Sequence, residues 1–505
     1  MKLYIKLILW IIFVVIVGLL VYFYITSMKQ EEETYQADIF SFIPKNTKSI
    51  LQINNLDMFS KQLAENVLKD FPDEKMLDWT KSLNRFIFPL KSDEKSFPGW
   101  GKGRILISFH DKGEMYYTKL RSDEIAVWKE MLENKIFPPF PPVIQKYEGK
   151  EILHYSLADN RFFSCVFNGG IFIGSFNSKL IEEAVSDWKN GTSVKSDPNF
   201  IRTSKTAGKK TLAILFYYVD KNNFFLTDTT EPNLNIEGWT SSDVSFPDNE
   251  IWLSGYYLPN DKTHDFSASI GSLKSAPLLR TRLFPRETVL IRSQLFDLNA
   301  IQSETSESKT EGEHSQKNIS ALNDLFLKYT ENELHVVYLK DSIKKEISKV
   351  YCLKINQKED FEKELRNYPN VFVKEKFITV KNPDLLSDIF RDNFFSKGTQ
   401  YHLSFFEDYA IISRNEEALG NYLNNLAKRS SPNYIDLAKK PGDPCHISVL
   451  GDLRSIRQYK NSILQFQGIT AEYPDFFSSR KMGIHFTKGD EFIFYHIVFK
   501  QYAVK

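Results

Sequence analysis

Pairs of serine and lysine three positions apart are the residues of this chain whose spacing most directly suggests chemistry. In penicillin-recognising enzymes a lysine at this spacing stands beside the serine nucleophile that is acylated. The spacing occurs at Ser92/Lys95, Ser306/Lys309, Ser342/Lys345 and Ser478/Lys481. No Lys-Thr-Gly or Ser-Asp-Asn segment accompanies any of these pairs. A chain rich in serine and lysine produces them by chance, so they do not predict an acyl-transfer enzyme.

Histidine is scattered along the sequence rather than gathered at metal-binding spacing. Five of the nine histidines lie in apolar, strand-like runs: His154, His335, His402, His446 and His496. In such places a histidine more often makes one structural hydrogen bond than it binds a metal. His110 and Asp111 are predicted at the tip of a hairpin, where polar residues are expected in any case.

Cys165, Cys352 and Cys445 stand far apart, with no Cys-x-x-Cys motif. Cys165 and Cys445 lie in apolar runs, which predicts buried, inert thiols. A single disulfide between these two residues is left open.

The other sequence signatures of catalysis and cofactor binding are missing. The chain has no HExxH, GxSxG, Walker A, EF-hand or GxGxxG motif. Gly99–Gly103 could present amide groups to an anion, although a flexible turn is the better interpretation. We therefore predict no catalytic residue, no cofactor and no metal ligand.

The segment Phe137–Pro142, with the sequence FPPFPP, is the most unusual local feature. Its stiff, extended backbone could dock into the groove of a partner. A rigid connection between a helix and the strand expected at Val143–Tyr147 explains it better, because a shorter proline turn, Tyr368–Asn370, occupies the corresponding place later in the chain.

Composition indicates a folded globular protein. Hydrophobic residues make up 42% and charged residues 26% of the 505 residues, and a chain of this length exceeds the size of a single core. Lysine and arginine number 65 against 64 acidic residues, so the net charge of +1 argues against nucleic acid as a partner.

Residues 7–26 form an uncharged apolar run, LILWIIFVVIVGLLVYFYIT. About 20 helical residues match the thickness of the hydrocarbon layer, so a transmembrane anchor in contact with the lipid bilayer is predicted. Lys2 and Lys6 precede the run and Glu31–Glu33 follow it, which places the N-terminus in the cytoplasm. The predicted localisation is the inner (cytoplasmic) membrane, as a single-pass protein with its body in the periplasm or outside. A cleaved signal peptide is the rival interpretation.

The two halves of the body share sequence features in the same order. Ile43–Thr47 before one apolar run matches Phe284–Thr288 before another, and Pro198-Asn199-Phe200-Ile201 matches Pro432-Asn433-Tyr434-Ile435. Two apolar hairpins each precede a helix that begins after an asparagine, Asn177 or Asn415, which are predicted N-caps. Two polar stretches, 228–243 and 302–318, interrupt the correspondence.

These patterns predict an α+β fold: an N-terminal transmembrane helix followed by two divergent repeats, each a mostly antiparallel sheet with helices packed on one face. The predicted ranges are 1–30 for the cytoplasmic stub and the anchor, 37–272 for the first repeat and 278–505 for the second. The closing hairpins are expected within 250–269 and 483–499.

An anchor followed by the segment Ile43-Pro44-Lys45-Asn46-Thr47 resembles an uncharacterised bacterial family of membrane-anchored proteins, described only as a domain of unknown function. The resemblance implies a bacterial envelope protein and no activity. The expected role is therefore non-enzymatic binding or scaffolding of an envelope protein partner, with the small-molecule ligand unknown. An envelope hydrolase or transferase with a dispersed active site between the repeats, and a carrier of hydrophobic cargo, are the alternatives.

Overall fold

The computed structural model describes residues 38–68, 104–136, 140–157, 162–208, 210–219, 226–228, 236–260, 266–298, 301, 316–341, 344–374, 376–381, 386, 390, 400–428, 430–439, 444–459, 463–466 and 474–502. By spatial contacts the chain divides into two compact units. The first comprises Met1–Ser60, Asp78–Ile201 and Leu212–Leu215, and the second comprises Lys61–Leu77, Arg202–Thr211 and Phe216–Lys505.

The first unit contains seven antiparallel strands and the helices between them. In order along the sheet the strands are β4 (Val143–Tyr147), β5 (Lys150–Ser156), β6 (Phe162–Asn168), β7 (Ile171–Ser175), β3 (Gly113–Lys119), β2 (Ile105–His110) and β1 (Ser49–Ile53). The helical elements are η1 (Ile39–Phe42), α4 (Ser122–Met131), η4 (Leu132–Ile136), α5 (Ser178–Asn190) and η5 (Val194–Ser196). Three elements reach both units, namely α2 (Leu56–Leu63), α6 (Pro198–Ser204) and β8 (Ala213–Val219).

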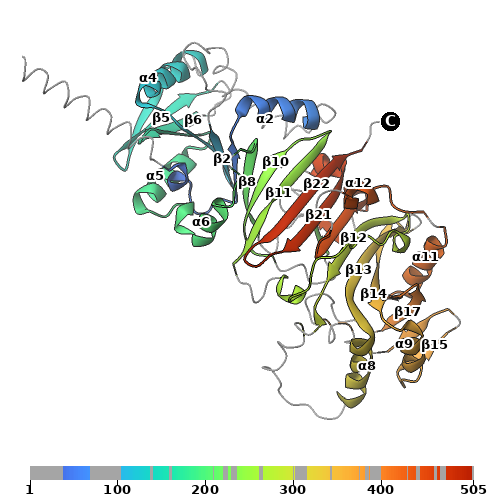
Figure 1. Cartoon of the computed structure of the whole chain (residues 1–505). Helices are drawn as coiled ribbons and strands as arrows, with labels where there is room; N and C mark the ends of the chain where they lie inside the picture. Colours follow the sequence, from blue (N-terminus) through green and yellow to red (C-terminus); the bar gives the residue numbers. More distant parts are fainter. Residues whose placement is uncertain are drawn as a thin grey trace, which may run out of the picture. The chain divides into compact units, whose positions relative to one another are not determined.

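The second unit contains the longest strands, several of which lie side by side in Figure 1. After β8 the order is β10 (Gly238–Ser245), β11 (Glu250–Pro259), β22 (Ile493–Gln501), β21 (Arg480–Lys488), β19 (Ile447–Asp452), β12 (Thr288–Leu295), β13 (Thr330–Asp341), β14 (Glu346–Ile355), β18 (Tyr409–Ser413), β17 (Tyr401–Phe406), β16 (Ile378–Val380) and β15 (Val371–Val373). A separate ribbon joins β9 (Leu226–Asp228) to β20 (Leu464–Phe466).

The helical elements of this unit are short. They are η2 (Ala64–Leu68), η6 (Ala268–Ile270), η7 (Thr281–Leu283), α8 (Gln316–Tyr329), α9 (Lys358–Leu365), α11 (Glu416–Leu426), η9 (Ile435–Lys439), α12 (Leu453–Gln458) and α14 (Pro474–Ser478).

The predicted fold class is wrong in two respects. Twenty of the strands in the described residues belong to a single antiparallel sheet, so the two predicted repeats do not each form a sheet of their own. The pairing of β11 with β22 shows this directly, because it joins a strand before residue 272 to one after residue 278. The bounds of the two compact units differ from the predicted ranges 37–272 and 278–505. That these two ranges are copies of one repeat stays a prediction.

The second error concerns the membrane. Among the helices that the structure describes, none has the length and apolar character needed to cross a bilayer; the longest α-helix, α8, has 14 residues, against about 20 required. The predicted anchor, residues 7–26, and the stub 1–30 lie outside the described residues. The single-pass, inner-membrane localisation therefore has no support in the structure and is withdrawn.

Strand pairing nevertheless follows one order in both parts of the chain. The pairs β1–β2, β2–β3, β3–β7, β7–β6, β6–β5 and β5–β4 correspond one for one to β12–β13, β13–β14, β14–β18, β18–β17, β17–β16 and β16–β15. The turns that lead into β1 and β12 also agree, since the amide of Thr47 donates to Pro44 and the amide of Thr288 to Pro285.

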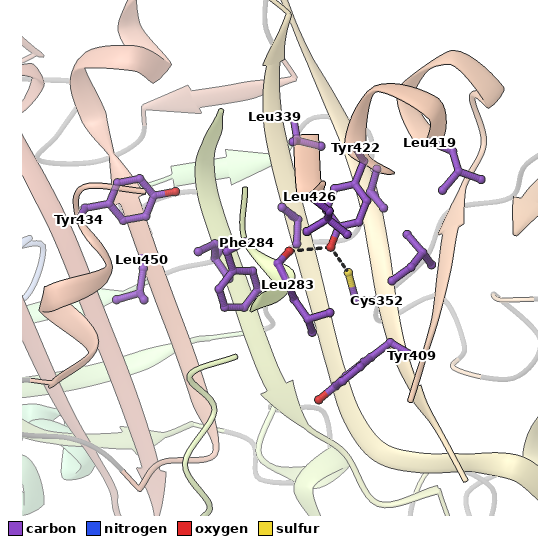
Figure 2. Close-up of a cluster of buried hydrophobic side chains, with 14 of the residues drawn as sticks. Leu283, Phe284, Leu339, Cys352, Tyr409, Leu419, Tyr422, Leu426, Tyr434 and Leu450 are labelled. Atoms are coloured by element: carbon purple, nitrogen blue, oxygen red, sulfur yellow. Dashed lines mark hydrogen bonds between the residues drawn. The ribbon is translucent and has the colours of Figure 1, made fainter. Parts of the chain in front are cut away.

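A dense aromatic and aliphatic core lies beneath α11, which packs on β14, β17 and β18 (Figure 2). The Tyr422 hydroxyl donates to the Leu283 carbonyl at 2.6 Å and lies 3.2 Å from the Cys352 sulfur. These contacts satisfy the only polar atom of a fully buried side chain, so Tyr422 fixes the helix to the segment before β12.

Asn177 and Asn415 are confirmed as N-caps. The Asn177 side chain accepts a hydrogen bond from the amide of Lys179, and the Asn415 side chain accepts from the amides of Glu417 and Ala418. In each case the preceding serine, Ser175 or Ser413, accepts a hydrogen bond from the asparagine amide.

Replacement of Asn415 by alanine is expected to lower the free energy of unfolding by about 1 kcal/mol, because two amide groups at the start of α11 lose their acceptor. Urea unfolding followed by tryptophan fluorescence measures the change. Asn424→Ala, on an exposed position of the same helix, is the matched control and should cause no loss. An equal loss in both variants would show that capping is not the cause.

Candidate functional site

Of the four serine–lysine pairs named above, the structure describes both residues of Ser478/Lys481 alone. The same spacing also occurs at Ser186/Lys189 on α5, where both side chains contact Glu148. Ser478 accepts a hydrogen bond from Arg457 and donates to the carbonyl of Asp475, while Lys481 donates to the carbonyl of Asn433. The two side chains serve different parts of the structure, so this pair is not a catalytic dyad. The other three pairs and Gly99–Gly103 lie wholly or partly outside the described residues.

The strand histidines make the structural hydrogen bonds that the sequence predicts. Four of them face a hydroxyl residue directly across the neighbouring strand: His154 with Ser164, His335 with Ser293, His402 with Thr379 and His496 with Ser254. His446, just before β19, bonds instead to the carbonyl of Leu273 and the amide of Lys488. His110 bonds to Ser108 at the β2–β3 hairpin.

Two of these histidines belong to arrangements that resemble catalytic ones. The first is a buried network around Glu333 on β13. Arg280 donates two hydrogen bonds to the Glu333 carboxylate, at 2.7 and 2.8 Å, and Tyr409 donates a third at 2.8 Å. His335 Nε2 lies 2.8 Å from the same carboxylate, and its Nδ1 lies 2.7 Å from the Ser293 hydroxyl. Ser293, His335 and Glu333 therefore form a serine–histidine–acid chain.

The burial of these three side chains excludes them as a nucleophilic site. The exposed fractions of Ser293 and His335 are 2% and 0%, so no substrate carbonyl can reach the hydroxyl. Burial alone would raise the pKa of Glu333, but the hydrogen bonds from His335 and Arg280 outweigh it and hold the pKa far below its usual value. Burial lowers the pKa of His335, against the opposing effect of Glu333. The network is a saturated, structural one.

The second arrangement, Ser254 on β11 with His496 on β22, is more accessible. Ser254 is half-buried, and its hydroxyl lies 2.5 Å from His496 Nδ1. Burial lowers the pKa of His496 to about 4, so protonation of the imidazole is unfavourable. A general base must accept a proton in the transition state, and within the described residues no group accepts a hydrogen bond from His496 Nε2 to stabilise the resulting charge. Ser254 is therefore a polar surface group rather than an activated nucleophile.

The cysteines and potential metal ligands offer no alternative. All three cysteines are free and buried, as predicted for Cys165 and Cys445. Burial raises the pKa of Cys165, and it raises the pKa of Cys352 to about 12, which disfavours the reactive thiolate. Within the described parts of the chain, no three histidine, cysteine or acidic side chains gather closely enough to hold a metal ion.

A different kind of site lies at the outer edge of the sheet. Strand β4 pairs with β5, and no strand among the described residues pairs with its other side. The exposed fractions at this edge are 64% for Phe140, 63% for Val143 and 58% for Ile144. These three residues define the β4 edge. Val143 and Ile144 point to opposite faces of the strand, so each face carries one exposed apolar side chain, followed by Gln145 on one face and Lys146 on the other.

The corresponding strand later in the chain, β15, shows the same property. It pairs with β16 on one side, and Phe372 and Val373 are 47% and 48% exposed. Of the nine large apolar side chains that are exposed in the described chain, five belong to these two edges. Contiguous exposed apolar surface on an unpaired strand is a candidate interaction surface.

Comparison with known proteins does not assign a family. No family model and no curated protein matches the chain, which agrees with a resemblance to an uncharacterised family. A solved structure described as "Structure of crystal form I of TP0453" aligns with 77% of this chain and 98% of its own, at 8% identity and a TM-score of 0.19. A score this low carries no argument about fold or function.

The sequence predicts the strand β4 with the correct bounds, but it does not predict that β4 is the edge strand of the sheet. The signal available was the neighbouring Phe137–Pro142 segment, since proline cannot donate to a ladder and therefore favours edges. Residues 140–142 of this segment lead directly into β4.

Proposed function

We propose that this protein is a non-enzymatic binding protein that takes up an extended segment of a partner protein along the β4 edge. The observation that supports the proposal best is the exposure of Val143 and Ile144 on an unpaired strand, with exposed fractions of 63% and 58%.

An unpaired strand presents a row of amide and carbonyl groups whose natural complement is the backbone of another strand. Strand addition provides main-chain hydrogen bonds, and side chains of alternating direction provide specificity. At the β4 edge Val143 lies on one face and Ile144 lies on the other. A partner segment with apolar side chains on both faces of its strand would therefore cover the edge.

The hydrolase or transferase alternative lacks comparable support. Ser293 is sealed from solvent, and Ser254 faces a histidine that is a poor base. The carrier of hydrophobic cargo would need an enclosed apolar space, whereas the exposed apolar residues at β4 line an open edge.

A photoreactive amino acid at position 143 tests the proposal in the intact chain. We expect a discrete crosslinked product in cells when the residue replaces Val143, and loss of at least about 80% of this product when Ile144→Lys is added, because a charge on the edge opposes strand pairing. Denaturing electrophoresis and mass spectrometry measure the product. A mass of twice the chain would identify a second copy as the partner.

Met58 offers the matched control, since it is 51% exposed on α2 rather than on a sheet edge. The photoreactive residue at position 58 should not give the same product. Absence of any product from position 143, or persistence of the product in the Ile144→Lys background, would contradict binding at the β4 edge.

A further inference from the structure

Three adjacent strands of the second unit display a regular array of side chains on one face. Residues directly opposite each other across antiparallel strands lie on the same face, as do residues two apart along a strand. The register places Ser245, Trp252 and Val498 in one row, Asp243, Ser254 and His496 in the next, and Ser241, Tyr256 and Phe494 in the third. These rows cross β10, β11 and β22.

Large and small side chains alternate along the middle strand. Trp252 and Tyr256 lie about 13 Å apart along β11, with the short side chain of Ser254 between them. Tyr256 is 40% and Phe494 is 37% exposed, while Trp252 and Ser254 are half-buried. Tyr256 and Phe494 therefore present aromatic surface to solvent on one side of Ser254, while Trp252 on the other side is half-buried and also packs against the core cluster of the second unit.

The aromatic side chains are held in fixed orientations. The indole of Trp252 donates to the carboxylate of Glu250 at 2.7 Å and packs edge-to-face against His496, with ring centroids 5.1 Å apart. Tyr256 packs edge-to-face against Phe494 at 5.8 Å and against Phe492 at 6.0 Å. Such contacts reduce the entropy lost when a ligand binds.

The charge beside this aromatic surface is negative. Asp243 lies directly opposite Ser254 and accepts hydrogen bonds from the amide of Gly208 and the hydroxyl of Thr211. Two hydrogen bonds leave part of the carboxylate's accepting capacity open. Burial raises the pKa of Asp243, so a neighbouring cation would stabilise its ionised form. The nearby Lys500 is already paired with Glu250 and Asp436.

From this arrangement we infer a binding site for a quaternary ammonium group on the face formed by Trp252, Ser254 and Tyr256, with Asp243 as the counter-charge. Aromatic faces attract a cation through the ring quadrupole, and a methylated ammonium group also contributes apolar contact. The group can belong to a small soluble molecule or to a lipid headgroup. The inference is independent of the β4 edge.

Saturation-transfer NMR on the full chain with choline as the probe tests the site. We expect transfer to the choline methyl protons, and affinity at least about 5-fold weaker for the neutral isostere 3,3-dimethyl-1-butanol, since the charge is what the rings and Asp243 recognise. Tyr256→Leu keeps an apolar side chain but removes the aromatic face, and should weaken choline binding by about the same factor. Asp243→Asn should act in the same direction.

Phe372→Ala, a similarly exposed aromatic residue on β15, is the control and should leave choline binding unchanged. Equal binding of choline and its neutral isostere would overturn the inference, and so would unchanged choline binding in Tyr256→Leu. The inference would also fail if the wild-type chain bound neither free choline nor phosphatidylcholine vesicles. Sedimentation with these vesicles that Tyr256→Leu abolishes assigns the group to a headgroup, whereas binding of free choline without vesicle binding assigns it to a small molecule.

Discussion

Replacement of Glu333 by alanine is expected to lower the free energy of unfolding of the second unit by about 3–5 kcal/mol, the range found when one partner of a buried ion pair is removed. Glu333 is the common acceptor for Arg280, Tyr409 and His335. Its loss leaves the fully buried His335 Nε2 and the Tyr409 hydroxyl without an acceptor, and it leaves the half-buried guanidinium of Arg280 without a carboxylate, with only its hydrogen bond to the Tyr409 hydroxyl. The desolvation of these groups would then be largely uncompensated.

Glu331→Ala is the matched control for this variant. Glu331 lies two residues away on the same strand, and its ion pair with Lys354 is solvent-exposed, so its loss should cost at most about 1 kcal/mol. Urea unfolding at pH 7 measures both variants. Equal destabilisation by Glu331→Ala and Glu333→Ala would show that the buried network contributes no more to stability than a surface ion pair.

Local elements were predictable because their signals are local. The hairpin β6–β7 follows from two apolar runs around Asn168-Gly169-Gly170, and the glycines at 169 and 170 indeed adopt positive φ. Helix α9 has the predicted bounds, Lys358–Leu365, and α5 and α11 begin after the asparagines that cap them. Each of these features depends on a few consecutive residues.

The architecture of the sheet was not predictable in the same way. Strand β11 was expected to form a hairpin within 250–269, but it pairs with β10 on one side and with β22, more than 200 residues away, on the other. No local pattern specifies a partner at that separation. The pairing of β11 with β22 is also what makes the sheet continuous between the predicted repeats.

Strand β10 was missed because its sequence, GWTSSDVS, appears polar, and most of it was assigned to the polar stretch 228–243. Its hydroxyl groups are buried but satisfied: Thr240 donates to the carbonyl of Tyr217, Ser241 bonds to Thr206, and Ser242 bonds to Tyr495. Buried polar side chains are tolerated when each has a partner, and those partners lie on other elements.

In the candidate sites, too, the local strands could be predicted from the sequence but their pairing could not. The strand at β4 could be predicted, yet its position at an edge depends on which strands pair elsewhere. The array of Asp243, Ser254, Trp252 and Tyr256 depends on the registers of β10, β11 and β22. A one-residue change in register would move every one of these side chains to the opposite face.

Acidification from about pH 6 to pH 4.5 is expected to destabilise the second unit steeply, by up to about 2.7 kcal/mol per pH unit from two histidines. His485 and His496 face each other across β21 and β22, and burial lowers the pKa of each to about 4. In the unfolded chain an ordinary histidine has a pKa of about 6.5. Between these values the unfolded state binds protons that the folded state does not, so stability is present above about pH 6.5 and is lost as the pH falls toward 4.

Urea unfolding at a series of pH values from 4.5 to 7.5 measures this slope, and the double variant His485→Gln/His496→Gln identifies its source. Glutamine does not titrate, so the double variant should lower the slope between pH 6 and 5 by up to about 2.7 kcal/mol per pH unit. Part of the slope should remain, because burial also lowers the pKa of His110 and His335. His154→Gln, at a less buried position, should change the slope far less. A double variant that retains the wild-type slope would contradict the assignment, because the protons taken up on unfolding would then belong to groups other than His485 and His496.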